Sequence, residues 1–127
     1  MDNKFYVSLE AARLLKEKGY NEPTEYLHSD DIIYKGICLN YLKPELCGGM
    51  IVEDNVSYPC PTKAEAIDWL EGKNLTINID WIRFNEQRRW CYGICNNETC
   101  DLEGSRYEYI TRLEAEDAAI IKACELL

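Results

Sequence analysis

The feature that most constrains the fold is a helix-start signal that occurs three times in 127 residues. Each copy places a hydroxyl residue before a mixture of alanines and acids. The hydroxyl can accept a hydrogen bond from a free backbone N–H of the first turn. In the second and third copies, Glu65 and Glu114 lie three residues after the hydroxyl and can reach back to the cap residue. The copies begin at Ser8, Thr62 and Thr111. They predict helices over residues 9–18, 63–72 and 112–126.

Strand signals lie between the second and third predicted helices. From Leu75 to Trp81, large apolar residues alternate with polar ones, the period of two that gives a strand one buried and one solvated face. The alternation slips at Trp81 and Ile82, where a bulge or the end of the buried stretch would explain it. A polar hairpin loop over 85–89 precedes a second alternating strand from Trp90 to Ile94. We expect a turn over 96–105 and then a short strand at 107–109.

The N-terminal half carries weaker strand signals. We expect one short strand at 25–28 and a second formed by 32–34 with 37–39. Residues 40–61 contain Pro44, Gly48, Gly49, Pro59 and Pro61, which forbid a long helix. This stretch is therefore predicted to be a loop with a short β segment at 50–52. A loop of this length inside a small domain is often functional.

The order of these elements predicts the fold class. Strands that follow one another through turns, rather than through helices, indicate an antiparallel sheet. We therefore predict a two-layer α+β fold, in which three helices pack mainly on one face of an antiparallel sheet of about four to five strands. The length is typical of one domain, so residues 1–127 are expected to form a single domain.

Composition narrows the function classes. The formal net charge of −9 disfavours direct binding to nucleic-acid phosphates. An alternative is that the carboxylates mimic phosphates and fill the basic groove of a DNA-binding protein. No apolar run reaches the length of a membrane span, and no apolar segment of the secretory type follows Met1. An odd number of cysteines, seven, argues against a complete disulfide framework. We expect a cytoplasmic protein with reduced thiols that binds neither membranes nor nucleic acid.

The cysteines offer one alternative function, a structural zinc site. Cys91, Cys95 and Cys100 lie within ten residues, and a fourth ligand could come from Cys60, Cys47 or His28. Structural zinc sites usually combine two closely spaced ligand pairs, and here the second pair is missing. In the other interpretation Cys91 and Cys95 are small apolar fillers of the sheet and Cys100 is a turn residue. We therefore predict no cofactor, with zinc as the alternative.

Catalysis by a cysteine nucleophile would need a base, and His28 is the only histidine. Cys60 is the thiol best placed for activation, because it precedes a predicted helix start. No catalytic motif surrounds either residue, and Cys60 lies between two prolines as a packed loop residue would. We expect His28 at the surface or at a sheet edge, and we predict that the protein is not an enzyme unless the 40–61 loop folds over a pocket that contains His28.

The predicted hairpin combines arginines with aromatic residues, a composition that is enriched at protein interfaces. We expect Trp81 in the core beneath the helices. The remaining candidates form a predicted surface for an unidentified protein partner, and a homodimer is also open. These candidates are Trp90, Arg88, Arg89, Arg83 and Tyr92.

One longer pattern resembles a known group of proteins. It consists of Pro61-Thr62, Ala66 and Trp69-Leu70, the Ile-rich strand up to Trp81, Trp90-Cys91-Tyr92, and Glu114-Ala115. This pattern resembles a family of small acidic proteins of Bacteroides-type bacteria, their phages and prophages, and the first helix followed by Lys18-Gly19-Tyr20 fits as well. The family brings no activity and no functional residues. The resemblance implies a phage or prophage origin and nothing about mechanism. From the missing catalytic groups and the arginine–aromatic hairpin, we predict an accessory protein that acts by protein–protein interaction.

Overall fold

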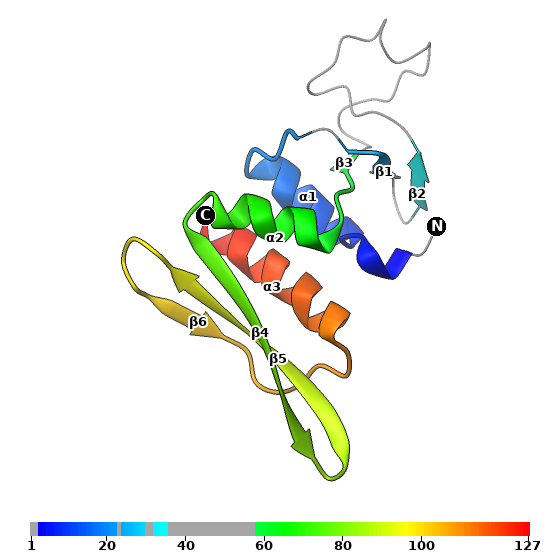
Figure 1. The fold of residues 1–127 in the computed structure, drawn as a ribbon. Helices are drawn as coiled ribbons and strands as arrows, with labels where there is room; N and C mark the ends of the chain where they lie inside the picture. The colour runs from blue at the N-terminus through cyan, green and yellow to red at the C-terminus, as the bar shows by residue number, and fades with distance from the viewer. Residues whose placement is uncertain (1–2, 23, 30–31, 36–57) are drawn as a thin grey trace, which may run out of the picture. The chain divides into compact units, whose positions relative to one another are not determined.

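The computed structural model describes residues 3–22, 24–29, 32–35 and 58–127 (Figure 1). The chain divides into two compact units, Met1–Thr62 and Lys63–Leu127. Each unit is described by itself below. The single domain over 1–127 stays a prediction. The predicted strand segments 37–39 and 50–52 lie outside the described residues.

The first unit contains a short 3₁₀ helix, one α-helix and a small antiparallel sheet. After η1 (Asn3–Phe5), helix α1 spans Leu9–Glu17, and the Ser8 hydroxyl accepts from the Ala11 N–H at 3.3 Å, which confirms the predicted cap. Strand β1 (Tyr26–Ser29) lies between β2 (Ile32–Lys35) and β3 (Tyr58–Pro59). The expected strands at 25–28 and 32–34 are therefore present. Part of the predicted 40–61 loop, by contrast, is the two-residue strand β3.

The second unit is an α+β structure, in which two helices pack against an antiparallel sheet. Its elements are α2 (Lys63–Glu71), β4 (Leu75–Phe84), β5 (Gln87–Asn96), β6 (Leu102–Gly104) and α3 (Arg112–Leu126). Helices α2 and α3 pack against each other and against the β4–β5 hairpin. The Thr111 hydroxyl caps α3 by accepting from the Glu114 N–H at 3.2 Å, as predicted. Small residues of α3 are fully buried, among them Ala115, Ala119 and Ala123.

The β4–β5 hairpin is longer and tighter than the sequence suggested. The two strands pair without interruption from Leu75 opposite Asn96 to Phe84 opposite Gln87. There is thus no bulge at Trp81–Ile82, and the slip in the pattern marks the end of the buried stretch. The turn contains only Asn85 and Glu86, so the predicted loop over 85–89 is wrong. Residues 87–89 belong to β5.

The third strand of this sheet also differs from expectation. The predicted strand at 107–109 is wrong, because β6 lies at 102–104, inside the predicted turn. Tyr109 instead forms an isolated bridge with Trp90, whose backbone it pairs with through two hydrogen bonds of 2.8 and 3.1 Å. The chain between β6 and α3 therefore follows β5 without forming a regular ladder.

The α+β class, the three α-helices and the antiparallel pairing are confirmed. The strands are divided between two three-stranded sheets, β2-β1-β3 and β4-β5-β6, instead of forming one. None of the helices among the described residues combines the length and apolar character that crossing a bilayer requires.

Candidate functional site

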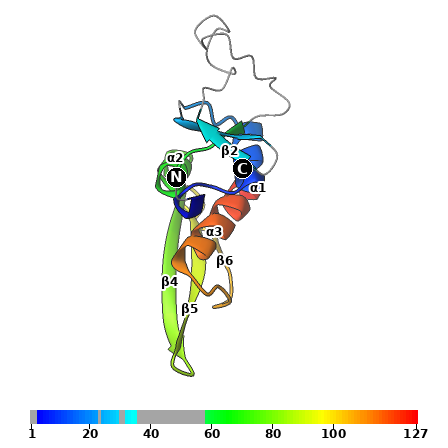
Figure 2. The same cartoon turned by 90° about the vertical axis from the view of Figure 1, so that its right-hand side faces the viewer.

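The closed end of the β4–β5 hairpin extends beyond the helices of its own unit (Figures 1 and 2). Its side chains are correspondingly exposed: Trp81 by 45 %, Ile82 by 39 % and Phe84 by 62 %. At the other end of the hairpin, Leu75 and Ile94 are buried. The expectation that Trp81 lies in the core is therefore wrong, because the helical layer ends before the hairpin does.

Register decides which side chains share a face at this end. Trp81 lies opposite Trp90, and Arg83 lies opposite Arg88. Residues two apart on a strand point to the same side, so these four side chains form one face. Arg89 lies opposite Ile82 and so belongs to the other face. We call the group Trp81, Arg83, Arg88, Arg89 and Trp90 the hairpin surface.

The two tryptophans of the hairpin surface form cation–π contacts with arginines. Their ring centroids are 6.3 Å apart, and the Arg88 guanidinium lies 4.3 Å from the Trp81 centroid and 5.8 Å from that of Trp90. The Arg112 guanidinium, at the start of α3, lies 5.8 Å from the Trp90 centroid. Cation–π contacts at exposed sites contribute about 0.5–1 kcal/mol each. The cluster therefore orders large exposed side chains before any partner arrives.

The remaining arginines of the surface differ in their surroundings. The Arg89 guanidinium donates to the Gln87 side-chain oxygen at 2.6 Å and to the Arg88 carbonyl at 3.1 Å. Arg83 faces Arg88 directly across the ladder. Like charges directly opposite each other destabilise a strand pair. Among the described residues, no acidic side chain forms an ion pair with Arg83, Arg88 or Arg89.

Tyr92, the fifth candidate from the sequence, belongs to the packed part of the hairpin. It is half-buried, and its ring centroid is 6.2 Å from that of Tyr109. Burial raises the pKa of the Tyr109 hydroxyl to about 12, with smaller contributions from Glu108 and Tyr92. Burial is also the main cause of the raised pKa of Tyr92. Tyr92 and Tyr109 are thus neutral, half-buried side chains whose rings pack against each other. Tyr92 therefore does not belong to the exposed cluster.

Two contributors were missed from the sequence: Trp81 and Arg112. Recognition of Asn85-Glu86 as a two-residue turn would have placed Trp81 opposite Trp90 by counting along the strands. The position of Arg112 depends on the path of the segment between β6 and α3, because this path sets where α3 begins. No local sequence pattern indicates the path.

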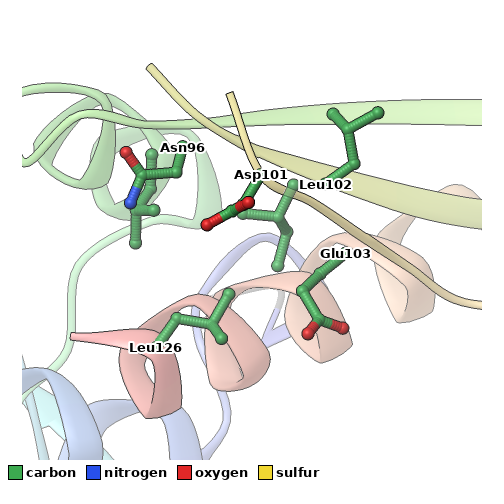
Figure 3. A pocket seen from close by; sticks show the side chains of 7 residues that line it. Asn96, Asp101, Leu102, Glu103 and Leu126 are labelled. Atoms are coloured by element: carbon green, nitrogen blue, oxygen red, sulfur yellow. The ribbon is translucent and has the colours of Figure 1, made fainter. Parts of the chain in front are cut away.

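A pocket of about 420 Å³ lies elsewhere in the second unit (Figure 3). Leu75, Ile94 and Leu126 supply apolar lining, and Asp101 and Glu103 supply carboxylates. Figure 3 shows the Glu103 carboxylate directed toward α3, from which Leu126 extends. Both acids are exposed, so neither has the desolvated environment that distinguishes a general acid from its partner base. Two exposed carboxylates at one pocket therefore do not indicate acid–base chemistry.

The cysteines of the zinc alternative are spread along β5 and the following turn. Cys91 and Cys95 lie four residues apart on an extended strand, about 13 Å by the usual rise per residue. Cys91 is buried. A hydrogen bond with the Cys91 side chain is the main cause of the raised pKa of Tyr107. Cys100 is an exposed turn residue with a φ of 66°. The described residues contain no group of three or more His, Cys, Asp or Glu side chains that could hold a metal ion. Cys47 lies outside them.

His28 is not at the surface or at a sheet edge, so that expectation is wrong. It lies on β1, the central strand of its sheet, with 4 % of its area exposed. Its Nε2 is 2.7 Å from the Val7 carbonyl oxygen, which requires the proton on Nε2, and its Nδ1 is buried with no hydrogen-bond partner in the described part of the chain. The Cys60 thiol also approaches the Val7 oxygen, at 3.9 Å. Both residues thus help to join η1 and β1 to the chain before α2.

Comparisons with protein-family profiles, with curated protein sequences and with solved structures give no match.

Proposed function

We propose that this protein is a non-enzymatic accessory factor that binds another protein through the hairpin surface. The observation that carries the proposal is Trp81, a large side chain that is 45 % exposed and lies under the Arg88 guanidinium at 4.3 Å. Tryptophan and arginine dominate the binding energy of many protein interfaces. Isolated exposed apolar residues are ordinary, but a tryptophan pair ordered by two arginines is not.

Order before binding increases the affinity that such a surface can reach. An interface loses about 0.5–1.5 kcal/mol for each flexible side chain that it immobilises. Trp81 and Trp90 are already restrained by each other and by their cations. Ile82 and Phe84 add exposed apolar area at the same end of the hairpin. A partner that covers this end would gain apolar burial at a reduced entropic cost.

The environment of the only histidine supports a binding role over a catalytic one. The Nε2 of His28 is occupied by the Val7 carbonyl, and its ring is buried in the sheet. The Cys60 thiol, 1 % exposed, contacts the same carbonyl oxygen. A Cys/His nucleophile would need the thiol and a ring nitrogen to face each other and the substrate.

The resemblance to proteins of Bacteroides-type bacteria and their phages suggests the cytoplasm of such a host as the source of the partner. The test is affinity capture from a lysate of such a host with the double variant Trp81→Ala/Arg88→Ala. Circular dichroism and thermal unfolding would show that this variant remains folded. We expect the captured partner to be reduced at least tenfold, because the exposed ring and its ordering cation are both removed.

A matched control comes from the first unit. Phe5 is 51 % exposed, and the Lys4 ammonium lies 5.2 Å from its ring centroid. The variant Lys4→Ala/Phe5→Ala therefore removes an exposed aromatic and its cation that do not belong to the hairpin. It should capture the partner as the natural protein does. Equal capture by both double variants would refute the proposed surface.

Two further measurements separate this function from its alternatives. Stoichiometric zinc in freshly purified, untagged protein would favour a structural metal module that uses the cysteines. Salt-sensitive binding to a basic DNA-binding protein that persists in Trp81→Ala/Arg88→Ala would favour a nucleic-acid mimic, since its binding would depend on carboxylates.

A further inference from the structure

The outer edge of β4 is open to another strand. The sheet order is β4-β5-β6, so one side of β4 has no neighbouring strand within the described part of the chain. The Asn97 N–H donates to the Asn74 carbonyl, and Trp90 exchanges its backbone hydrogen bonds with Tyr109. Because hydrogen-bonded and non-bonded pairs alternate along an antiparallel ladder, the odd-numbered residues of β4 direct their backbone groups away from β5.

These outward groups form a row that runs to the hairpin surface. It includes the backbone of Ile77, Ile79, Trp81 and Arg83. The Trp81 N–H donates to the Asp80 side chain at 2.8 Å. In the described structure, the N–H groups of Ile77, Ile79 and Arg83 have no hydrogen-bond acceptor. An unpaired strand edge is a template for an extended peptide, and a local carboxylate on one donor is a typical device that limits uncontrolled pairing.

The charge at this edge is opposite to that of the rest of the chain. Residues 80–90 contain three arginines, one aspartate and one glutamate, a net charge of +1. The remaining residues contain 11 basic and 21 acidic side chains, because the whole chain has 14 and 23. Arg83 and Arg88 lie opposite each other without an acidic partner among the described residues. The edge is therefore complementary to carboxylates.

Stacking leaves the guanidinium of Arg88 able to bind an anion. Its carbon lies 4.3 Å from the Trp81 ring centroid. A guanidinium stacked on an aromatic ring keeps its in-plane N–H groups available, and these match the two oxygens of a carboxylate. Arg83, on the outer strand itself, is adjacent to any chain that pairs with β4. The same end of the hairpin thus offers backbone donors, cations and an apolar ring.

We infer that the partner presents an extended acidic segment, which adds to the outer edge of β4 as a fourth strand and places its carboxylates at Arg83 and Arg88. This inference rests on the proposed function and names the chemistry of its partner. A single-stranded nucleic acid would meet the arginines and the tryptophans but could not use the backbone edge. The free N–H groups favour a peptide, because only a peptide can pair with them as a further strand.

The test uses the full chain and synthetic blocked decapeptides with alternating residues. The probe alternates Glu with Val, and its neutral match alternates Gln with Val. A third peptide keeps the glutamates but carries N-methyl groups along its pairing edge, and a ten-nucleotide oligothymidylate represents nucleic acid. Binding is followed by tryptophan fluorescence, and backbone amide exchange is followed by NMR in the same samples.

We expect the Glu peptide to bind at least tenfold more tightly than its Gln and N-methyl matches, and to lose at least tenfold in affinity to Arg83→Ala/Arg88→Ala. On binding, the amides of Ile77, Ile79 and Arg83 should exchange at least tenfold more slowly. The amides of Thr76 and Asn78 point toward β5 and serve as internal controls, since their exchange should change little.

Five results would overturn the inference. Equal binding of the Glu and Gln peptides would reject the acidic partner, and binding without protection of Ile77 and Ile79 would reject strand addition. Tighter binding of the oligonucleotide would assign the surface to nucleic acid. Protection of the same amides that grows with protein concentration alone would assign the edge to a second copy of this chain. The natural protein could also fail to bind any of the peptides while Trp81→Ala/Arg88→Ala still loses capture of the host protein. That result would reject this inference and leave the proposed surface intact.

Discussion

The turn of the β4–β5 hairpin carries a conformational strain that a single substitution should relieve. Asn85 and Glu86 have φ values of 50° and 65°, the left-handed region that both central residues of a type I′ turn occupy. Asparagine tolerates this region, but glutamate has no local compensation. An ordinary L-residue there loses about 1–2 kcal/mol. We therefore predict that Glu86→Gly stabilises the protein.

The expected magnitude follows from two opposing terms. Glycine removes the left-handed penalty at residue 86, and it adds about 0.5–1 kcal/mol of backbone entropy to the unfolded chain. The net gain in the free energy of unfolding is about 0.5–1 kcal/mol. For a protein of this size, with roughly 4 °C per kcal/mol, the midpoint of thermal unfolding should rise by about 2–4 °C.

The assay is urea unfolding followed by circular dichroism and tryptophan fluorescence, with similar m-values required for the comparison. Glu86→Gln is the matched control, because it removes the charge near the arginines but keeps the Cβ at positive φ. Gln87→Gly places glycine one residue later, in the extended strand β5, and should instead lower stability. If Glu86→Gly proves no more stable than Glu86→Gln, the turn is not strained and the reasoning fails.

Three further predictions follow from buried and exposed groups. Because the folded pKa of Tyr109 is raised from 10.0 to about 12, mainly by burial, stability should decline as pH rises through that interval, and Tyr109→Phe should flatten the decline in urea midpoints. Cys100 is exposed and Cys124 is fully buried, so mass spectrometry should find Cys100 alkylated first and Cys124 only after unfolding. His28→Ala should lower the free energy of unfolding by about 2–4 kcal/mol, measured in urea, since the buried Val7 carbonyl loses its donor and a cavity remains.

Local signals predicted the elements whose formation depends on neighbouring residues. Ser8 and Thr111 cap their helices through their own hydroxyls, and the alternating pattern from Leu75 onward is a strand. These features involve contacts over three or four residues, so the sequence carries them directly. The position of β6 could not be read in the same way. Leu102 is 79 % exposed, and this three-residue strand exists because β5 offers a partner edge, not because of its own composition.

The candidate site shows a similar limit. Its arginines and Trp90 were recognisable by composition, but the exposure of Trp81 depends on where the helical layer ends. An alternating strand predicts which residues share a face, and it does not predict how far along the strand that face is covered. The covered stretch ends after Ile79, and from Asp80 to Phe84 every residue is exposed. A tryptophan at this boundary looks like a core residue in the sequence and is a surface residue in the fold.

The net charge of the chain does not describe how its charges are distributed over the surface. The total of −9 argues against binding to polyanions when it is treated as uniform. Charges interact over about 8 Å at physiological ionic strength, so a ligand at the end of the hairpin responds mainly to the residues around it. There the register brings Arg83 against Arg88, beside Trp81 and the open edge of β4. An acidic protein can therefore recruit an acidic segment where its arginines outnumber the nearby carboxylates, as three arginines outnumber Asp80 and Glu86 here. Binding at this site should then weaken with added salt far less steeply than binding to a nucleic acid, because only a few charges are involved.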